Sequence, residues 1–298
     1  MNISIIGSKG LAKQLGKKGT SSDITLYNTS FQGRYFTFIE PEKYPEKVQT
    51  LFQAMSMSQF TILYLTADLP KNILGECIIA VDTLKKKGAI VLDVMEKDEI
   101  KPILQETSLR DFPILENNPT KIFEFLSEIE QENIQGKPKV VIDHSFLVKS
   151  VGNVALGTVA SGEIKKYDKL TLFPAKKEVM IKSIQIHDKD YDKASCGDRL
   201  GVSVKGAEVE ELKRGSVISD RMDCLKELSV SITKNKFFKD DIPNEVMCII
   251  GLQYVRAEMK ENKLLFESEI AYDGEKIIIL TPEKKMRVFG VAAALSET

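Results

Sequence analysis

The feature that most constrains the fold is a change of pattern at residues 133–138, which read NIQGKP. Before this segment, short apolar runs alternate with stretches of helical spacing, as in an α/β domain built on a parallel sheet. After it, helical periodicity is almost absent, and short alternating runs are separated by glycines and Asp-Lys turns. That pattern favours closed antiparallel β-barrels. The segment is therefore expected to be a linker between an α/β domain and all-β domains.

Hydrophobic spacing places the elements of the α/β region. Strands are expected at Asn2–Gly7, Asp23–Thr29, Gly33–Glu40, Phe60–Leu65, Ala89–Val94 and Pro113–Leu115. Helices are expected at Pro45–Met57, Ile73–Lys87, Lys97–Thr107 and Thr120–Gln131. Gly88 is expected to end the second helix, and Asn118-Pro119 to open the last one.

Composition narrows the functional classes. The 298 residues carry 42 basic and 43 acidic side chains, so no overall field draws the protein onto nucleic acid, and any RNA contact would need a local patch. The N-terminus lacks the pattern of a signal peptide, and the apolar runs are strand-sized rather than membrane-spanning. The cysteines show no C-x-x-C pairing, so no metal site and no disulfide framework is expected. They are Cys77, Cys196, Cys224 and Cys248. Reduced thiols in a cytoplasmic protein are the simplest interpretation.

Three motifs occur in order within the first β region. They are Gly152–Ile164, with glycines spaced along an apolar run, Ala194–Gly201, which contains Gly-Asp-Arg-Leu-Gly, and Leu212–Ile218. Glycines at such positions allow barrel strands to bend or to approach another backbone. The set resembles domain 2 of elongation factor Tu and, more closely, of the selenocysteine-specific elongation factor SelB. The chain is thus similar to the translational GTPase superfamily.

The resemblance implies a fold of three parts. A degenerate P-loop GTPase-like α/β domain is expected at 1–133, followed by a domain 2-like antiparallel barrel at 139–221 and a domain 3-like barrel at 222–298. Three segments follow the order of the third SelB domain: Lys236–Lys239, Val246–Gly251 and Met286–Gly290. In that family the activity is GTP hydrolysis, and the partners are tRNA and the ribosome.

The phosphate-binding motif of the family is incomplete. A G-x-x-x-x-G-K-[ST] loop wraps backbone N–H groups round the phosphates, while its lysine and hydroxyl serve the phosphate charge and Mg²⁺. The matching stretch, from Gly7 to Gln14, reads GSKGLAKQ. Gly7 and Lys13 fit the motif, but Ala12 replaces the second glycine, and its Cβ is expected to hinder close approach to phosphate. Gln14 replaces the Mg²⁺-binding hydroxyl.

Two other nucleotide motifs are also altered. The D-x-P-G-H motif aligns with EPEKY, from Glu40 to Tyr44, which lacks the glycine that contacts the γ-phosphate and the histidine that positions the attacking water. Glu40 is expected to be a solvated carboxylate at a strand end. The guanine-reading N-K-x-D motif aligns with DVME, from Asp93 to Glu96, where valine cannot replace the lysine that packs on the base.

The effector loop is also shortened, since 26 residues separate Lys13 from Glu40. Thr20 and Thr25 are Mg²⁺ candidates by position alone and are expected to be loop and strand residues. These losses together predict a pseudo-GTPase with no catalytic residue. If GTP or GDP with Mg²⁺ still binds, the candidate nucleotide-binding residues are Gly7, Lys13, Glu40 and Glu96.

In the family, domain 2 helps to form the pocket for the aminoacyl end of charged tRNA and contacts the ribosome. Carried onto this chain, the candidate RNA-binding residues are Asp143, His144, Lys149, Arg199 and Arg214. His144 can equally be an internal partner of a neighbouring strand. Arg199 and Arg214 can instead stabilise turns by bonding loop carbonyls.

Two further sets have a functional and a simpler interpretation. Lys9, Lys13, Lys17 and Lys18, expected in the damaged loop and the helix after it, could bind phosphate or RNA or could be a solvated surface. Phe237-Phe238 could stack on bases, but neighbouring strand residues point to opposite faces, so one of them is expected in the core.

The leading hypothesis is a monomeric, cytoplasmic translation-factor-like protein that binds tRNA or the ribosome without competent GTP hydrolysis. No membrane and no DNA partner is expected. One alternative is a divergent GTP-binding elongation factor with weak GTPase activity. Another is a protein-docking scaffold derived from a translation factor.

Overall fold

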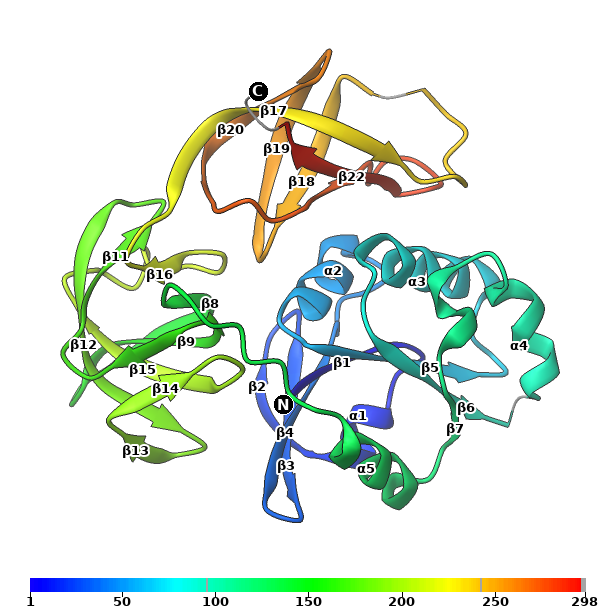
Figure 1. The fold of residues 1–298 in the computed structure, drawn as a ribbon, viewed down its shortest axis with the longest axis horizontal. Helices are drawn as coiled ribbons and strands as arrows, with labels where there is room; N and C mark the ends of the chain where they lie inside the picture. Colours follow the sequence, from blue (N-terminus) through cyan, green and yellow to red (C-terminus); the bar gives the residue numbers. More distant parts are fainter. Residues whose placement is uncertain (95, 242, 296–298) are drawn as a thin grey trace. The chain divides into compact units, whose positions relative to one another are not determined.

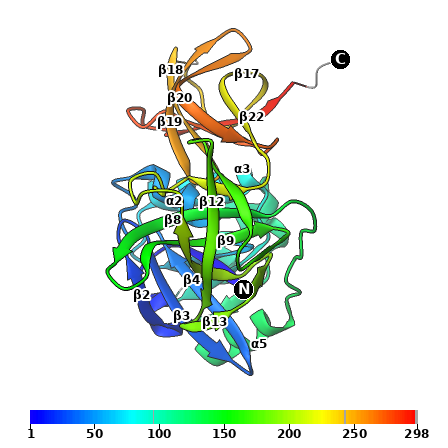
Figure 2. The same ribbon diagram turned by 90° about the vertical axis from the view of Figure 1, so that its left-hand side faces the viewer.

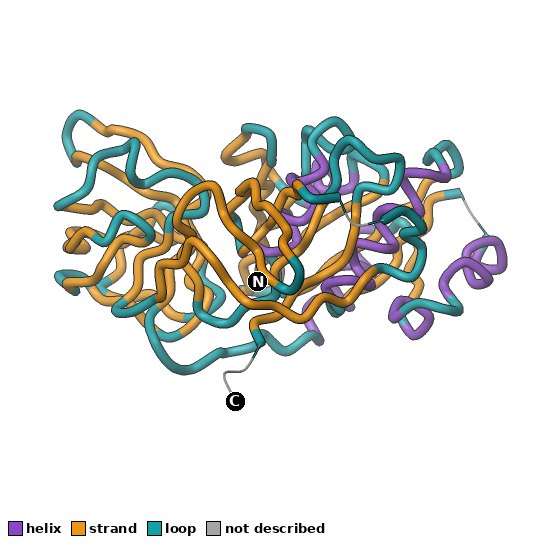
Figure 3. The backbone as a smooth tube through the Cα atoms, turned by 90° about the horizontal axis from the view of Figure 1, so that it is seen from above, coloured by secondary structure: helices purple, strands orange, loops and turns teal. Residues whose placement is uncertain are grey.

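The computed structural model describes residues 1–94, 96–241 and 243–295 (Figures 1 and 3). The chain divides into two compact units. The first unit holds residues 1–131 together with two short segments from late in the chain, 235–238 and 282–288. The second unit holds the remaining described residues, which form two β-barrels.

A seven-stranded mixed sheet forms the centre of the first unit. Its strands, in spatial order, are β2 (Lys17–Ser21), β3 (Thr25–Phe31), β4 (Arg34–Glu40), β1 (Asn2–Gly7), β5 (Phe60–Thr66), β6 (Gly88–Asp93) and β7 (Ile114–Glu116). From β4 to β7 the neighbours are parallel, whereas β2, β3 and β4 pair antiparallel. The carboxyl ends of the parallel strands therefore share one edge of the sheet, where α/β proteins place their sites.

Helices cover both faces of this sheet (Figure 1). They are α1 (Leu11–Leu15), α2 (Val48–Ser56), α3 (Lys71–Leu84), α4 (Lys97–Leu104) and α5 (Pro119–Glu128), with a 3₁₀ turn, η1, at Ser108–Asp111. Apolar residues of α1 and α5 share a core cluster with alternate residues of the strands, including Ile3 and Ile5. That alternation assigns α1 and α5 to one face, and Figure 1 shows α2 and α3 on the other.

Two local expectations were wrong. Lys17 and Lys18 lie on edge strand β2 and not in a helix, because α1 ends at Leu15. Gly88 does not end α3. The helix ends at Leu84 and is capped by Lys85, which takes a left-handed conformation with φ +51°, and Gly88 opens β6. A Cβ on Gly88 would collide with the carbonyl oxygen of Thr61 on the neighbouring strand, so the glycine serves close strand pairing.

Two closed barrels make up the second unit. The first is closed by β11 (Lys169–Phe173), β16 (Val217–Ser219), β8 (Lys139–Val148), β9 (Gly152–Ser161), β15 (Arg199–Lys205) and β12 (Lys177–Ile186), because β11 also pairs with β12. Strand β13 (Lys189–Tyr191) extends this sheet beyond β12 (Figure 2), and β10 (Glu163–Lys165) pairs with β14 (Lys193–Ser195). The second barrel contains β17 (Asp223–Lys234), β20 (Lys263–Tyr272), β19 (Gln253–Lys260), β18 (Glu245–Ile250), β21 (Ile277–Leu280) and β22 (Val288–Ala294).

The expected fold class is confirmed: an α/β domain precedes two antiparallel barrels. The two barrels meet closely at Gly215, where φ is +88° and a Cβ would lie 2.9 Å from the Cα and the N of Gln253. The expected third domain ends at 298, and its last three residues lie outside the described part of the chain.

Candidate functional site

The loop that follows β1 is short, because α1 begins at Leu11. Only Ser8, Lys9 and Gly10 separate β1 from α1, so Ala12 and Lys13 already lie inside the helix. Gly7 has φ +97°, and a Cβ there would collide with the carbonyl oxygen of Tyr64, which accepts a 2.9 Å hydrogen bond from the N–H of Ser8. The glycine therefore allows β1 to turn tightly against β5. Ala12 is fully buried in the core, and its methyl group packs against apolar neighbours.

A carboxylate of the protein itself accepts a hydrogen bond from the backbone N–H at the start of α1. The backbone N–H of Gly10 donates to Oε1 of Glu40 at 3.1 Å. Glu40 is only 4% exposed, so the expectation of a solvated carboxylate was wrong. Burial raises the pKa of Glu40, and the hydrogen bond from Gly10 opposes that shift. The ammonium of Lys9 donates to the carbonyl oxygen of Glu42 at 2.7 Å. Lys13 is exposed on α1.

Tyr44, in the place of the missing histidine, belongs to a buried polar network. Its hydroxyl donates to Oε2 of Glu76 at 2.8 Å and accepts from the thiol of Cys77 at 3.7 Å. Burial is the main cause that raises the pKa of Tyr44, and it also raises the pKa of Cys77, to about 12. A phenol that is held protonated and bonded to Glu76 is not available to orient a water molecule.

Arg287, in the segment 282–288 of the first unit, completes this network. Its Nε donates to Oε1 of Glu76 at 2.9 Å, and its Nη2 donates to the other oxygen of the same carboxylate. Its Nη1 donates to the carbonyl oxygen of Pro45 at 2.6 Å, and the guanidinium lies 5.8 Å from the ring centre of Tyr44. The bidentate pair fixes residues 44–45. Nothing in the sequence signals this pair, because its partners are 211 positions apart.

The residues at the guanine-reading position present few groups that could bind a base. One oxygen of Asp93 accepts a 2.9 Å hydrogen bond from the hydroxyl of Tyr64. Val94 is 91% exposed, Glu96 is exposed before α4, and Met95 lies outside the described residues. Both threonine candidates are strand residues. Thr20 lies on β2, so the expectation of a loop was wrong for it. Thr25 is fully buried on β3, as expected of a strand residue.

Three of the five RNA candidates form one internal cluster in the first barrel. Arg199 makes two hydrogen bonds to the carboxylate of Asp143, one of them 2.9 Å long. The side chains of Asp143 and Arg199 are only 6% and 12% exposed. Nε of Arg214 donates to the carbonyl oxygen of Asp143 at 3.2 Å. The structure therefore gives these two arginines internal hydrogen-bond partners around Asp143, with Arg214 half-buried.

The other two candidates lie on the hairpin between β8 and β9. Lys149 is exposed in the turn, and His144 is half-buried on β8, with its ring 6.3 Å from that of Phe146. Phe146 and Leu147 beside them are 39% and 67% exposed, although both are large and apolar. These two residues were not among the candidates expected from the sequence. The available signal was an unbroken apolar run directly before Lys149, where a half-buried strand would alternate.

The aromatic pair at 237–238 separates as expected, with Phe238 buried and Phe237 42% exposed. The reason differs, because these residues lie in a turn and not on a strand. The ammonium of Lys236 lies 4.9 Å from the ring centre of Phe237 and also contacts Glu106.

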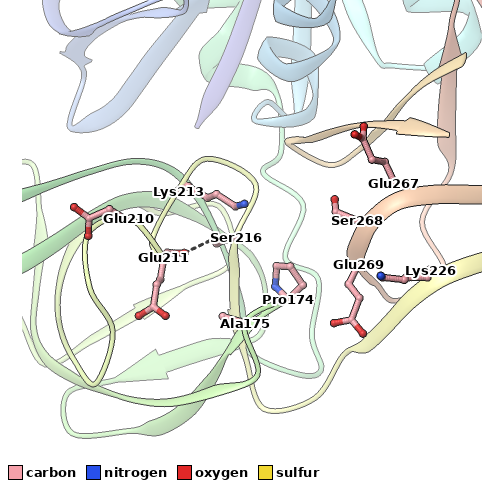
Figure 4. A pocket seen from close by; sticks show the side chains of 10 residues that line it. All are labelled: Pro174, Ala175, Glu210, Glu211, Lys213, Ser216, Lys226, Glu267, Ser268 and Glu269. Atoms are coloured by element: carbon pink, nitrogen blue, oxygen red, sulfur yellow. Dashed lines mark hydrogen bonds between the residues drawn. The ribbon is translucent and has the colours of Figure 1, made fainter.

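A hollow of about 610 Å³ lies in the second unit, and Pro174 and Ser216 are among the residues that line it (Figure 4). Charged side chains of both signs line most of it: Glu210, Glu211, Lys213, Lys226, Glu267 and Glu269. Two of these carboxylates are already paired, Glu211 with Lys177 and Glu269 with Lys176. A wall with this many charged side chains differs from the mainly apolar pockets that usually bind small molecules.

Within the described residues, no group of three or more His, Cys, Asp or Glu side chains is placed to hold a metal ion. In the same part of the chain, no helix is long and apolar enough to cross a membrane.

Comparison with known proteins identifies the family to which the chain belongs. The family model for elongation factor Tu domain 2 matches residues 152–219. An uncharacterized protein from Methanocaldococcus jannaschii is 36% identical over 295 residues, which cover 95% of each chain. The selenocysteine-specific elongation factor of the same organism is 28% identical over 251 residues, which cover 76% of this chain and 53% of that protein. This chain belongs to the translational GTPase superfamily, and within it the chain is SelB-like.

Solved structures agree at the level of the fold. The elongation factor SelB from Methanococcus maripaludis, in complex with the GTP analogue GPPNHP, superposes with a TM-score of 0.85. It is 19% identical, and the match covers all of this chain and 79% of that one. The bacterial selenocysteine-specific elongation factor matches with a TM-score of 0.82 over 57% of its own length. Members of this superfamily therefore share the architecture of this chain, one α/β domain followed by two barrels.

Proposed function

We propose that this protein is a cytoplasmic translation-factor-like protein that binds tRNA or the ribosome through its barrels and does not hydrolyse GTP. The observation that carries the proposal is the hydrogen bond from the N–H of Gly10 to the buried carboxylate of Glu40. In a P-loop, such N–H groups bind phosphate oxygens. Here a phosphate would have to displace Glu40 or lie beside a like charge in a poorly solvated site.

The hydrolytic step has no agent in the same region. Water activation in this superfamily depends on a positioned side chain beside the γ-phosphate. The residue at that place, Tyr44, is 3% exposed and hydrogen-bonded to Glu76. Lys13, the one surviving basic group of the motif, projects from α1 into solvent. Nucleotide binding in the family manner would therefore require α1, Glu40 and Tyr44 all to rearrange.

The barrels supply the groups that support RNA binding. On the β8–β9 hairpin, Lys149 offers a charge for phosphate, and the exposed ring of Phe146 offers a face for a base. His144 lies next to that ring. Asp143 and Arg199 would then serve as an internal support for the base of this hairpin and would not contact RNA.

Gel shift with charged and uncharged tRNA, and co-sedimentation with ribosomes, test the proposal at about 100 mM salt, where phosphate contacts still contribute. Removing one phosphate contact with Lys149→Ala should make the negative slope of log K against log salt shallower by about 1. Lys71→Ala, at the exposed start of α3, serves as a matched control for an exposed lysine. Failure to bind any of these RNAs would overturn the proposal. Capture of a protein and no RNA in a pull-down would favour the docking scaffold.

A further inference from the structure

Two turns in the first barrel share one geometry, although the residue before the shared aspartate is a glycine in one and a tyrosine in the other. In each turn an aspartate, Asp168 or Asp198, accepts a hydrogen bond from the backbone N–H three residues earlier, at 2.7 Å and 2.8 Å. The strands that lead into the turns, β10 and β14, pair with each other. The residue before each aspartate is left-handed, with φ +89° at Gly197 and φ +72° at Tyr167.

Tyr167 gains little stability from its side chain. A left-handed conformation is free for glycine and unfavourable for other L-residues. The backbone N–H of Tyr167 donates to the carbonyl oxygen of Ile181 at 2.7 Å, so the main chain is held in place by a bond that any residue except proline could make. The side chain is 65% exposed and does not bury its ring in the core. Strain at a displayed residue, with no gain in packing, is typical of positions that serve binding.

A second exposed ring lies on the same edge of β12 as Tyr167. Strand β13 pairs with the end of β12 and brings Tyr191, 43% exposed, opposite Ile184. Strand β11 pairs with the beginning of β12, and Tyr167, just before β11, bonds through its backbone N–H to Ile181 on the same edge. Ile181 and Ile184 are three residues apart, so the backbone contacts of the two tyrosines lie about 10 Å apart along the strand. Figure 2 shows β12 and β13 together in this region.

Cations accompany these rings. The ammonium of Lys166 lies 5.2 Å from the ring centre of Tyr167, and Lys189 begins β13. Four carboxylates lie on the same segments, and two of them, Asp168 and Asp190, accept side-chain hydrogen bonds from neutral donors. Asp168 accepts from the backbone of its own turn, and Asp190 accepts from the amide of Gln185 at 3.0 Å. Exposed rings beside ammonium groups match the chemistry of a nucleotide, whose base stacks on the ring while its phosphate meets the cation.

We propose that Tyr167 and Tyr191, with Lys166 and Lys189, form a second RNA-binding surface that takes unpaired bases. This tyrosine surface is distinct from the β8–β9 hairpin, and it rests on the RNA-binding role proposed above. Tyr167 is the residue on which the proposal depends most, because glycine would fit its left-handed backbone better and the ring must have another use.

Fluorescence anisotropy with a labelled, uridine-rich single-stranded RNA of about 12 nucleotides tests the surface at about 100 mM salt. Tyr167→Gly should weaken binding by about 5- to 150-fold, the range that corresponds to one stacked base. The midpoint of thermal unfolding should stay the same or rise, since glycine accepts φ +72°. Tyr167→Phe keeps the ring and should bind like the native protein.

Native affinity in Tyr167→Gly would overturn the tyrosine surface, and so would a loss of affinity that Tyr167→Phe shares. The double variant Phe146→Ala/Lys149→Ala distinguishes this failure from failure of the wider proposal. If the double variant loses RNA and Tyr167→Gly does not, the hairpin binds RNA and the tyrosine surface does not. If the native protein binds neither this RNA nor tRNA nor ribosomes, both proposals fail.

Discussion

Replacing Arg199 with alanine separates an internal role of this residue from an RNA contact. The native guanidinium makes two charge-assisted hydrogen bonds to Asp143, whose side chain is 6% exposed. Arg199→Ala would leave that carboxylate buried without its counter-ion, and removing one partner of a buried pair costs about 3–5 kcal/mol. Arg199 is itself 12% exposed, so some solvent can reach the site and the lower end, about 3 kcal/mol, is expected.

The assay is urea denaturation followed by far-ultraviolet circular dichroism, since the chain has no tryptophan. The transition of the β unit should move to lower urea in Arg199→Ala. The exposed control Lys149→Ala should stay within about 0.5 kcal/mol of the native protein. In the double variant Arg199→Met/Asp143→Leu, part of the loss should be recovered, because both charges are gone.

The reasoning is refuted if Arg199→Ala unfolds like the native protein and yet binds tRNA more weakly. Arg199 would then be a surface contact to RNA, and its pairing with Asp143 would carry little stability.

Two further predictions concern the first unit. Glu40→Gln keeps an acceptor for the N–H of Gly10 but removes the charge. Because burial raises the pKa of Glu40, the stability that this group gives the native protein is full below its ordinary pKa and is lost as the pH rises through the raised value. In denaturation series, the free energy of unfolding of the variant minus that of the native protein should therefore increase from acid to neutral pH, and a constant difference would contradict the burial. Arg287→Ala leaves the carboxylate of Glu76 buried beside Tyr44 without its counter-ion, so the free energy of unfolding of the first unit should fall by about 3 kcal/mol. The backbone amides of residues 43–47 should also exchange faster with deuterium. Unchanged exchange would show that Arg287 does not hold that loop.

Hydrophobic pattern was enough to predict the architecture. Strands such as β1 and β5 are continuous β-branched or apolar runs, and parallel strands buried on both faces have this signature. The barrels followed from short alternating runs between glycines. Strand β2 was missed because its residues, KKGTS, are polar on both faces, as is common for an edge strand.

The candidate site could be predicted only as a set of missing motifs. That Ala12, Gln14 and Tyr44 break the motifs can be read in order along the chain. What replaces the motifs depends on contacts between distant residues, such as Gly10 with Glu40 and Glu76 with Arg287, which hydrophobic spacing does not encode. The same limit explains why Arg199 could not be assigned to Asp143, 56 positions away.

The most direct test of the central claim is a titration of the native protein with a fluorescent GTP analogue and Mg²⁺. The hydrogen bond between Gly10 and Glu40 predicts no saturable binding up to about 1 mM nucleotide, which corresponds to a binding free energy weaker than about −4 kcal/mol. Saturable binding below about 10 μM, with release of phosphate on standing, would contradict the account and establish a divergent GTPase.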